Sequence, residues 1–128
     1  MGNKFYELGA IVTSSDVRKE HIEVVNKIYP HIKTLLIDCD NEDIINKYDI
    51  ILHWGLLYHL NEIEIHLEKN SQKCNVLLLE TEVSYSEKDN FFIKTNEKNF
   101  DQAFNHVGIR PSSFYVEKVL KKMDFNLK

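Results

Sequence analysis

Short apolar segments alternate with helical patterns along the first two thirds of the chain, and this alternation limits the possible folds more than any other feature. Four segments are rich in Ile, Val or Leu and have the length of strands: residues 10–14, 34–38, 49–52 and 75–80. Between them, apolar residues recur at helical spacing: Ile22, Val25 and Ile28, then Leu60, Ile63 and Leu67. This order is typical of βαβ units. We predict a doubly wound α/β fold with a mainly parallel sheet and helices on both faces.

The pattern changes after Glu80. Residues 84–104 are polar and aromatic, with one strand-like piece at 91–93 and a helical turn expected at 101–105. A helix is predicted to open at Arg110-Pro111-Ser112-Ser113, because Pro and Ser favour helix starts and apolar residues follow at helical spacing. A last strand is expected to begin near Asp124.

Size and composition fit one globular domain spanning residues 1–128. The chain has 128 residues, of which 43% are hydrophobic and 28% charged. Its net charge of -4 comes from mixed acidic and basic residues, which argues against an extended nucleic-acid surface. No apolar stretch approaches the roughly 20 residues needed to cross a bilayer, so we expect no membrane association and a soluble, cytoplasmic protein. The two cysteines, Cys39 and Cys74, fit reduced thiols.

The segment from Lys47 to Leu60 indicates a ligand site. Its apolar run stops at His53-Trp54-Gly55 and passes into a short amphipathic piece that ends Tyr58-His59-Leu60. Buried parallel strands have this pattern, and ligands of open α/β sheets bind beyond the carboxyl ends of the strands. The residues that follow this strand are therefore candidates for binding or catalysis.

The same segment resembles the fourth-strand signature of class I S-adenosylmethionine (SAM)-dependent methyltransferases, an Asp-apolar-apolar strand followed by a Leu-Tyr-His-Leu-like helix start. Residues 9–16 resemble the second strand of that family, and residues 35–43 resemble the end of its third strand. The resemblance covers residues 4–125, but the first strand and its glycine-rich turn have no counterpart here. The expectation is a shortened Rossmann-like methyltransferase domain whose glycine-rich motif lies upstream of residue 1 or was lost.

The resemblance implies SAM as the cofactor and suggests how adenosine is held. Asp16 would accept hydrogen bonds from both ribose hydroxyls, Asp40 and Asn41 would meet the adenine, and Trp54 would stack on the adenine or wall the methionine portion. Asp38 competes with Asp40 for the adenine role. From the residues alone, Asp16 could instead cap a helix that begins at Val17, and an acidic loop after a strand could be a solvated turn.

Three residues are candidates for catalysis on a small-molecule acceptor: His53, His59 and Glu82. Imidazole titrates near neutral pH and can serve as a base, although His59 could simply bond the backbone and Glu82 could face solvent. Arg110 could neutralise an anionic group of the acceptor or pair with Asp101. The histidine spacing matches no zinc pattern, so no metal is expected.

Two further interpretations stay open beside a methyltransferase with weak or lost activity. The chain could be a non-catalytic binding or scaffold domain derived from a methyltransferase, or another enzyme that binds an adenosine compound. Because the absent strand normally lies at the centre of the family's sheet, its loss would leave unpaired edges. We therefore expect a homo-oligomer or a partner subunit that covers them.

Overall fold

The computed structural model describes residues 1–99, 102–123 and 125. The chain forms two compact units, Met1–Glu42 and Asp43–Lys128, and each is described by itself. The prediction of a single domain over residues 1–128 stays a prediction. In the described ranges, no helix has the length and apolar character that a membrane crossing requires.

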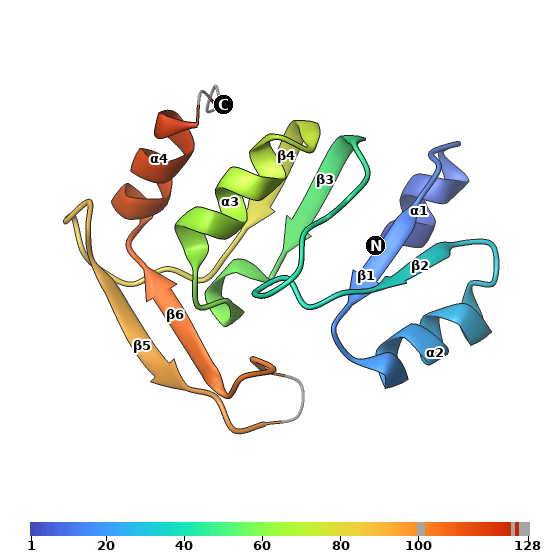
Figure 1. The fold of residues 1–128 in the computed structure, drawn as a ribbon, viewed down its shortest axis with the longest axis horizontal. Coiled ribbons are helices and arrows are strands. Elements are labelled where there is room, and N and C mark those ends of the chain that lie inside the picture. The colour runs from blue at the N-terminus through green and yellow to red at the C-terminus, as the bar shows by residue number, and fades with distance from the viewer. Residues whose placement is uncertain (100–101, 124, 126–128) are drawn as a thin grey trace. The chain divides into compact units, whose positions relative to one another are not determined.

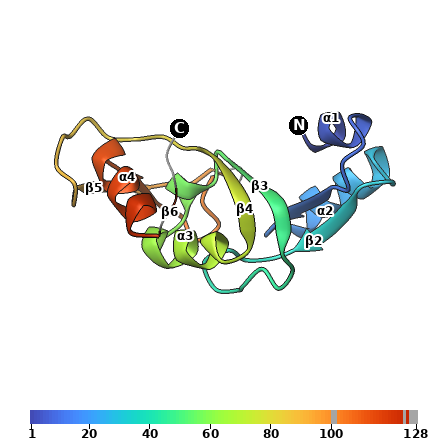
Figure 2. The ribbon, with the colours of Figure 1, turned by 90° about the horizontal axis from the view of Figure 1, so that it is seen from above.

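The first unit is a parallel strand pair with one helix packed on it. Its elements are α1 (Gly2–Glu7), β1 (Thr13–Asp16), α2 (Lys19–Ile28) and β2 (Lys33–Leu36). The register runs from Thr13 opposite Lys33 to Asp16 opposite Leu36, so the carboxyl ends of both strands meet at one edge. Helix α2 connects the strands and contacts both of them (Figures 1 and 2). This is the βαβ connection that the sequence predicts.

The second unit begins with another parallel pair. Its elements are β3 (Tyr48–Trp54), the short 3-10 helix η1 (Leu57–His59), α3 (Ile63–Ser71) and β4 (Cys74–Glu80). The register ends with Trp54 opposite Glu80, so the two strands finish together. Helix α3 packs against β4 (Figure 1). The strand predictions at 49–52 and 75–80 fall inside β3 and β4.

The rest of the second unit contains an antiparallel pair and a helix: β5 (Phe92–Asn96), β6 (Val107–Pro111) and α4 (Ser113–Lys122). The predicted helix opening within residues 110–113 is confirmed at its serines: β6 continues through Pro111, and α4 begins at Ser113. Ser112 is the N-cap, and its hydroxyl accepts the Tyr115 N–H at 3.0 Å. Residues 102–105 form a bend and turn and not a helical turn; Asp101 and Asp124 lie outside the described residues.

The described strands thus form three two-stranded sheets, of which two are parallel and one is antiparallel. Short, mostly parallel sheets with helices agree with the predicted α/β class. The predicted strand limits shift by up to three residues. The run at 10–14 begins in a loop where Ile11 is fully exposed, and pairing starts only at Thr13.

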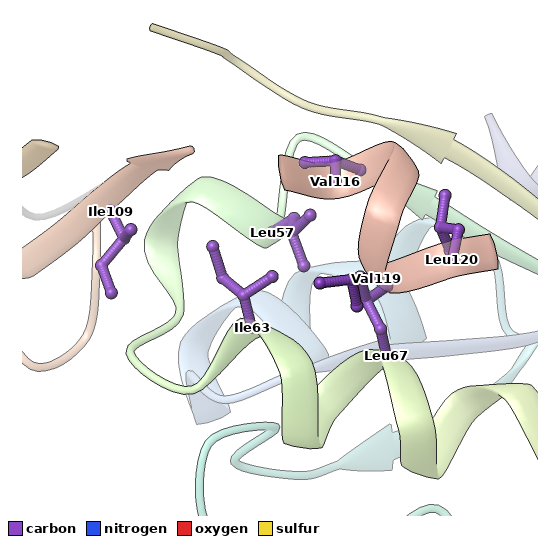
Figure 3. Close-up of a cluster of buried hydrophobic side chains, with 7 residues drawn as sticks. All are labelled: Leu57, Ile63, Leu67, Ile109, Val116, Val119 and Leu120. Carbon is purple, nitrogen blue, oxygen red and sulfur yellow. The ribbon is translucent and has the colours of Figure 1, made fainter. Parts of the chain in front are cut away.

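A buried apolar cluster holds the second unit together (Figure 3). It joins η1, α3, β6 and α4 through seven side chains: Leu57, Ile63, Leu67, Ile109, Val116, Val119 and Leu120. Leu77 and Leu79 of β4 pack against it. This cluster fixes η1 and β6, the two elements that carry His59 and Arg110.

Shortening Leu67 should destabilise the second unit strongly. Its side chain is fully buried, so Leu67→Ala is expected to lower the free energy of unfolding by about 2 to 5 kcal/mol, through lost transfer energy and a residual cavity. Ile65→Ala on the same helix is the control, because Ile65 is 48% exposed. Urea denaturation would measure both. Equal losses would mean that α3 does not bury Leu67.

Candidate functional site

Asp16, at the carboxyl end of β1, shapes the entry into α2. One carboxylate oxygen accepts the backbone N–H of Arg18 at 2.8 Å, and the other lies 3.0 Å from Nδ1 of His21. The helix begins at Lys19 with Arg18 as N-cap, so Asp16 holds the preceding turn and is not the cap residue. Each carboxylate oxygen can accept a second hydrogen bond. The residue therefore has acceptor capacity left for a pair of ribose hydroxyls.

The acidic loop after β2 is organised by Asp38. Its carboxylate accepts the backbone N–H of Asp40 at 3.0 Å and the side-chain amide of Asn41 at 2.8 Å. Glu42 closes the loop by accepting the Asp38 N–H at 2.8 Å. Asp38 thus has a structural role in the loop. Burial first, and then Asp38 and Asp40, raise the pKa of the Cys39 thiol to about 11, so the loop carries a negative potential.

The first unit also has a surface hollow at the opposite edge. It has a volume of about 550 Å³, and Tyr6, His31 and Lys33 are among the residues that line it. Lys33 is the first residue of β2, so this hollow lies at the amino ends of the strands. Asp16 and the acidic loop lie at the carboxyl ends and do not line it.

His53 and Trp54 end β3 on opposite faces. Trp54 is 61% exposed, whereas His53 is 3% exposed and packs toward α3, with its Nε2 2.6 Å from Nε2 of His66. The Asn70 amide nitrogen donates to the same His66 atom at 3.0 Å, so His66 Nε2 is the acceptor and His53 Nε2 carries the proton. Nδ1 of His53 has no hydrogen-bond partner among the described residues. Burial, and then the neighbouring His66, lower the pKa of His53 to about 3.

Gly55 turns the chain out of β3. Its φ of 64° lies in the left-handed region that favours glycine, and its N–H donates to the Glu80 carbonyl at 3.2 Å. The turn leads directly into η1, which carries Tyr58 and His59. Arg110 of β6 donates from Nη1 to the Tyr58 carbonyl at 3.0 Å and so anchors η1.

Glu97, which follows β5, is the centre of a buried polar cluster. Its carboxylate accepts from Nδ1 of His59 at 2.5 Å, from Nη2 of Arg110 at 2.5 Å and from the Ala103 N–H at 2.8 Å. Burial raises the pKa of Glu97, but the hydrogen bonds from Arg110, Ala103 and His59 lower it by more, so the net pKa is below the ordinary value. Gly108 leaves the space for this cluster, because a Cβ there would lie 2.5 Å from Glu97 Oε1.

Arg110 joins this cluster to Glu82. Its Nε lies 2.8 Å from a Glu82 carboxylate oxygen, and its guanidinium lies 4.7 Å from the centre of the Tyr58 ring. Glu82 is largely exposed, whereas Arg110 is nearly buried. Of the two roles predicted for Arg110, the structure shows pairing, with Glu82 and Glu97 as the partners. The Asp101 alternative lies outside the described residues.

Solved structures of similar fold identify the architecture. The N-terminal domain of EvdMO1 with S-adenosylhomocysteine (SAH) bound superposes with a TM-score of 0.71 at 14% identity, covering 90% of this chain and 55% of that one. The 1,6-didemethyltoxoflavin-N1-methyltransferase of Burkholderia thailandensis, with SAH bound, gives 0.56 at 15% identity, covering 97% and 54%. Coclaurine N-methyltransferase, also with SAH, gives 0.57 at 22% identity, covering 84% and 35%. The fold is that of SAM-dependent methyltransferases.

This chain spans about half the length of the first two of these structures. No protein-family model matches the sequence, and no curated protein is significantly similar to it. The similarity therefore rests on the fold, at identities of 22% or less.

The methyltransferase fold divides the predicted site residues between the two units. Asp16, Asp40 and Asn41 belong to the first, and the other four to the second: His53, Trp54, His59 and Glu82. The second unit brings His59 to Glu97 and Glu82 to Arg110, and it buries His53 in its core. Sequence reasoning missed Glu97, which lies 38 positions from His59 and has no local motif. The described residues contain no group of three or more His, Cys, Asp or Glu side chains placed to hold a metal ion.

Proposed function

We propose that this chain is part of a SAM-dependent methyltransferase that acts on a small-molecule acceptor. The observation that carries the proposal is the match in fold to three structures that contain SAH, two of which are named methyltransferases. Polar groups at the carboxyl ends of the parallel strands in each unit add support, because ligands of open α/β sheets bind there. The doubly wound sheet with helices on both faces remains part of the proposal.

The residues proposed to contact the cofactor are Asp16, Asp40 and Asn41 in the first unit and, as a separate proposal, Trp54 in the second unit. When bound, SAM supplies a methyl group activated by its positive sulfur. Asp16 would accept from the ribose hydroxyls through its remaining lone pairs, and Asp40 and Asn41 would meet the adenine. In the second unit, the exposed Trp54 ring would offer an aromatic face to the cofactor. The negative potential of the acidic loop attracts the hydrogen-bond donors of adenosine, which are its amino group and its ribose hydroxyls.

The acceptor side uses His59, which pairs with Glu97, and Glu82, which pairs with Arg110. Methyl transfer is an in-line displacement, so most of its catalysis is positioning. His53 was predicted to face the acceptor, but its ring is buried and bonded to His66. We assign it instead to the support of the β3 end.

Calorimetric titration with SAH tests the cofactor proposal. Asp16→Ala is expected to weaken binding by about 1.5 to 3 kcal/mol, the scale of hydrogen bonds to a charged group. Glu20→Ala is the matched control, because it removes one negative charge from the exposed face of α2 and should leave the affinity unchanged. No heat at millimolar SAH with the wild-type chain would overturn the function. Equal affinity of wild type and Asp16→Ala would overturn the ribose role alone.

A second candidate is a non-catalytic binding domain that pairs with a second copy or a partner subunit. Its support is an apolar patch on one face of β3 and β4, where strand alternation places Ile50, Leu52, Val76 and Leu78 together. Three of these side chains are between 43% and 49% exposed. Light scattering during size-exclusion chromatography, combined with the SAH titration, separates the candidates. An oligomer without SAH binding would favour the binding domain.

A further inference from the structure

The contact between His59 and Glu97 fixes where the imidazole carries its proton. An ionised carboxylate is an acceptor only, so the 2.5 Å contact requires a hydrogen on Nδ1 of His59. In the neutral ring, Nε2 is then unprotonated and able to accept a proton. The His59 side chain is 19% exposed, so the ring is not sealed in the core as His53 is.

The surroundings of Glu97 keep its carboxylate ionised. The side chain is 1% exposed, yet it accepts three hydrogen bonds, and one of them comes from the permanently charged Arg110. The Tyr58 ring lies beside the His59 ring, tilted by 49° with a centroid distance of 4.2 Å, and Glu82 binds Nε of Arg110. The orientation of the His59 ring is therefore set by Glu97, which Arg110 holds in place.

We propose that Glu97 is a positioning residue that holds His59 in the Nδ1–H form, so that Nε2 serves as the general base of the methyl transfer. This inference rests on the proposed function, and it specifies the acceptor class: the nucleophile is a hydroxyl or amine that carries a proton. A carboxylate–histidine pair of this kind is needed only when the acceptor must lose a proton.

A hydroxyl acceptor gives its proton to Nε2 of His59 as an oxygen lone pair forms a bond to the methyl carbon. A protonated amine first gives its ammonium proton to Nε2, and the lone pair freed on nitrogen then forms that bond. The bond between that carbon and the sulfur of SAM breaks, and its electron pair stays on the sulfur, which yields SAH. His59 is then a cation with hydrogens on both ring nitrogens, and Glu97 stabilises it. The proton leaves to solvent when the product departs.

Other candidate bases in the described part of the second unit fit less well. Nε2 of His53 is committed to His66 inside the core. Glu82 is paired with Arg110. His106 is exposed, but its Nδ1 contacts only the backbone carbonyl of Glu97 at 3.3 Å, so no carboxylate orients it.

Long-range ¹H–¹⁵N NMR spectra of the ¹⁵N-labelled full chain test the inference without any cofactor, at a pH where the ring is neutral. His59 is expected to show a protonated Nδ1 and an unprotonated Nε2. Glu97→Gln should abolish the preference for Nδ1–H, and Glu97→Asp, which retains the charge, should restore part of it. Glu82→Gln is the matched control and should leave the tautomer unchanged, because Glu82 contacts Arg110 but not His59.

The result that overturns the inference is a wild-type His59 with its proton on Nε2, or a tautomer that Glu97→Gln does not change. The wild-type spectrum alone decides the point if Glu97→Gln fails to fold. The SAH titration reports on the proposed function separately: a chain that shows the Nδ1–H form but binds no SAH would keep the Glu97–His59 pair and overturn the methyltransferase.

Discussion

Replacing Glu97 by Ala is expected to lower the free energy of unfolding by about 3 to 5 kcal/mol, the cost of removing one partner from a buried ion pair. The substitution leaves Arg110, which is 14% exposed, without its buried counter-ion. It also leaves the Ala103 N–H and Nδ1 of His59 without an acceptor. Several buried groups lose a partner at once, which places the loss at the upper end of single-substitution effects.

Glu82→Ala is the matched control for this prediction. Glu82 pairs with the same guanidinium, but its side chain is 58% exposed, and exposed ion pairs contribute about 0 to 1 kcal/mol. Urea denaturation at neutral pH, followed by far-UV circular dichroism, would compare the variants. Equal losses for Glu97→Ala and Glu82→Ala would contradict the buried cluster.

Acid should destabilise the second unit through His53 well before the carboxylates titrate. The unfolded chain binds a proton at His53 below pH 6.5, whereas the folded chain binds it only near pH 3. The unfolded state therefore holds more protons between these values, and stability falls as the pH falls. From pH 6.5 to 5 the loss from this group alone is about 2 kcal/mol. The pKa of Glu97 is lowered from 4.5, so its contribution to the free energy of unfolding is lost only as the pH falls below 4.5.

The free energy of urea unfolding, measured at half-unit steps from pH 7 to 5, would show this loss. His53→Gln removes the titrating ring and should flatten the pH dependence, whereas His31→Gln, at an exposed position, should keep it. An equally steep pH dependence in His53→Gln would mean that the buried histidine pair does not cause the acid sensitivity.

Local patterns were sufficient to predict the parallel units. The apolar runs at 49–52 and 75–80 lie within β3 and β4, and the helical spacing from Ile22 to Ile28 lies within α2. Strand ends were less accurate, because pairing depends on the partner: β3 gains Tyr48 and Trp54 opposite Cys74 and Glu80. The helix predicted to open within residues 110–113 begins only at Ser113, because β5 pairs with the chain through Pro111, and pairing to a distant strand overrides local propensity.

The candidate site was less predictable, because its contacts join residues far apart in the sequence. Nothing near Glu97 indicates that it meets His59 or Arg110, which come from η1 and β6. Strand alternation could have shown that the neighbours His53 and Trp54 point to opposite faces of β3. Only one of them could therefore line a site on a given face, and the structure buries His53.

The strand pairing described above also bears on how the chain folds as it is synthesised. Each of the six strands in the described residues pairs with its immediate neighbour along the chain. Each connection joins two strands that are consecutive in the chain, so the entropic cost of closing it is limited. A pair such as β1 and β2 needs no later residue to complete its hydrogen bonds. Each pair can therefore form on the ribosome while the downstream sequence is still being translated.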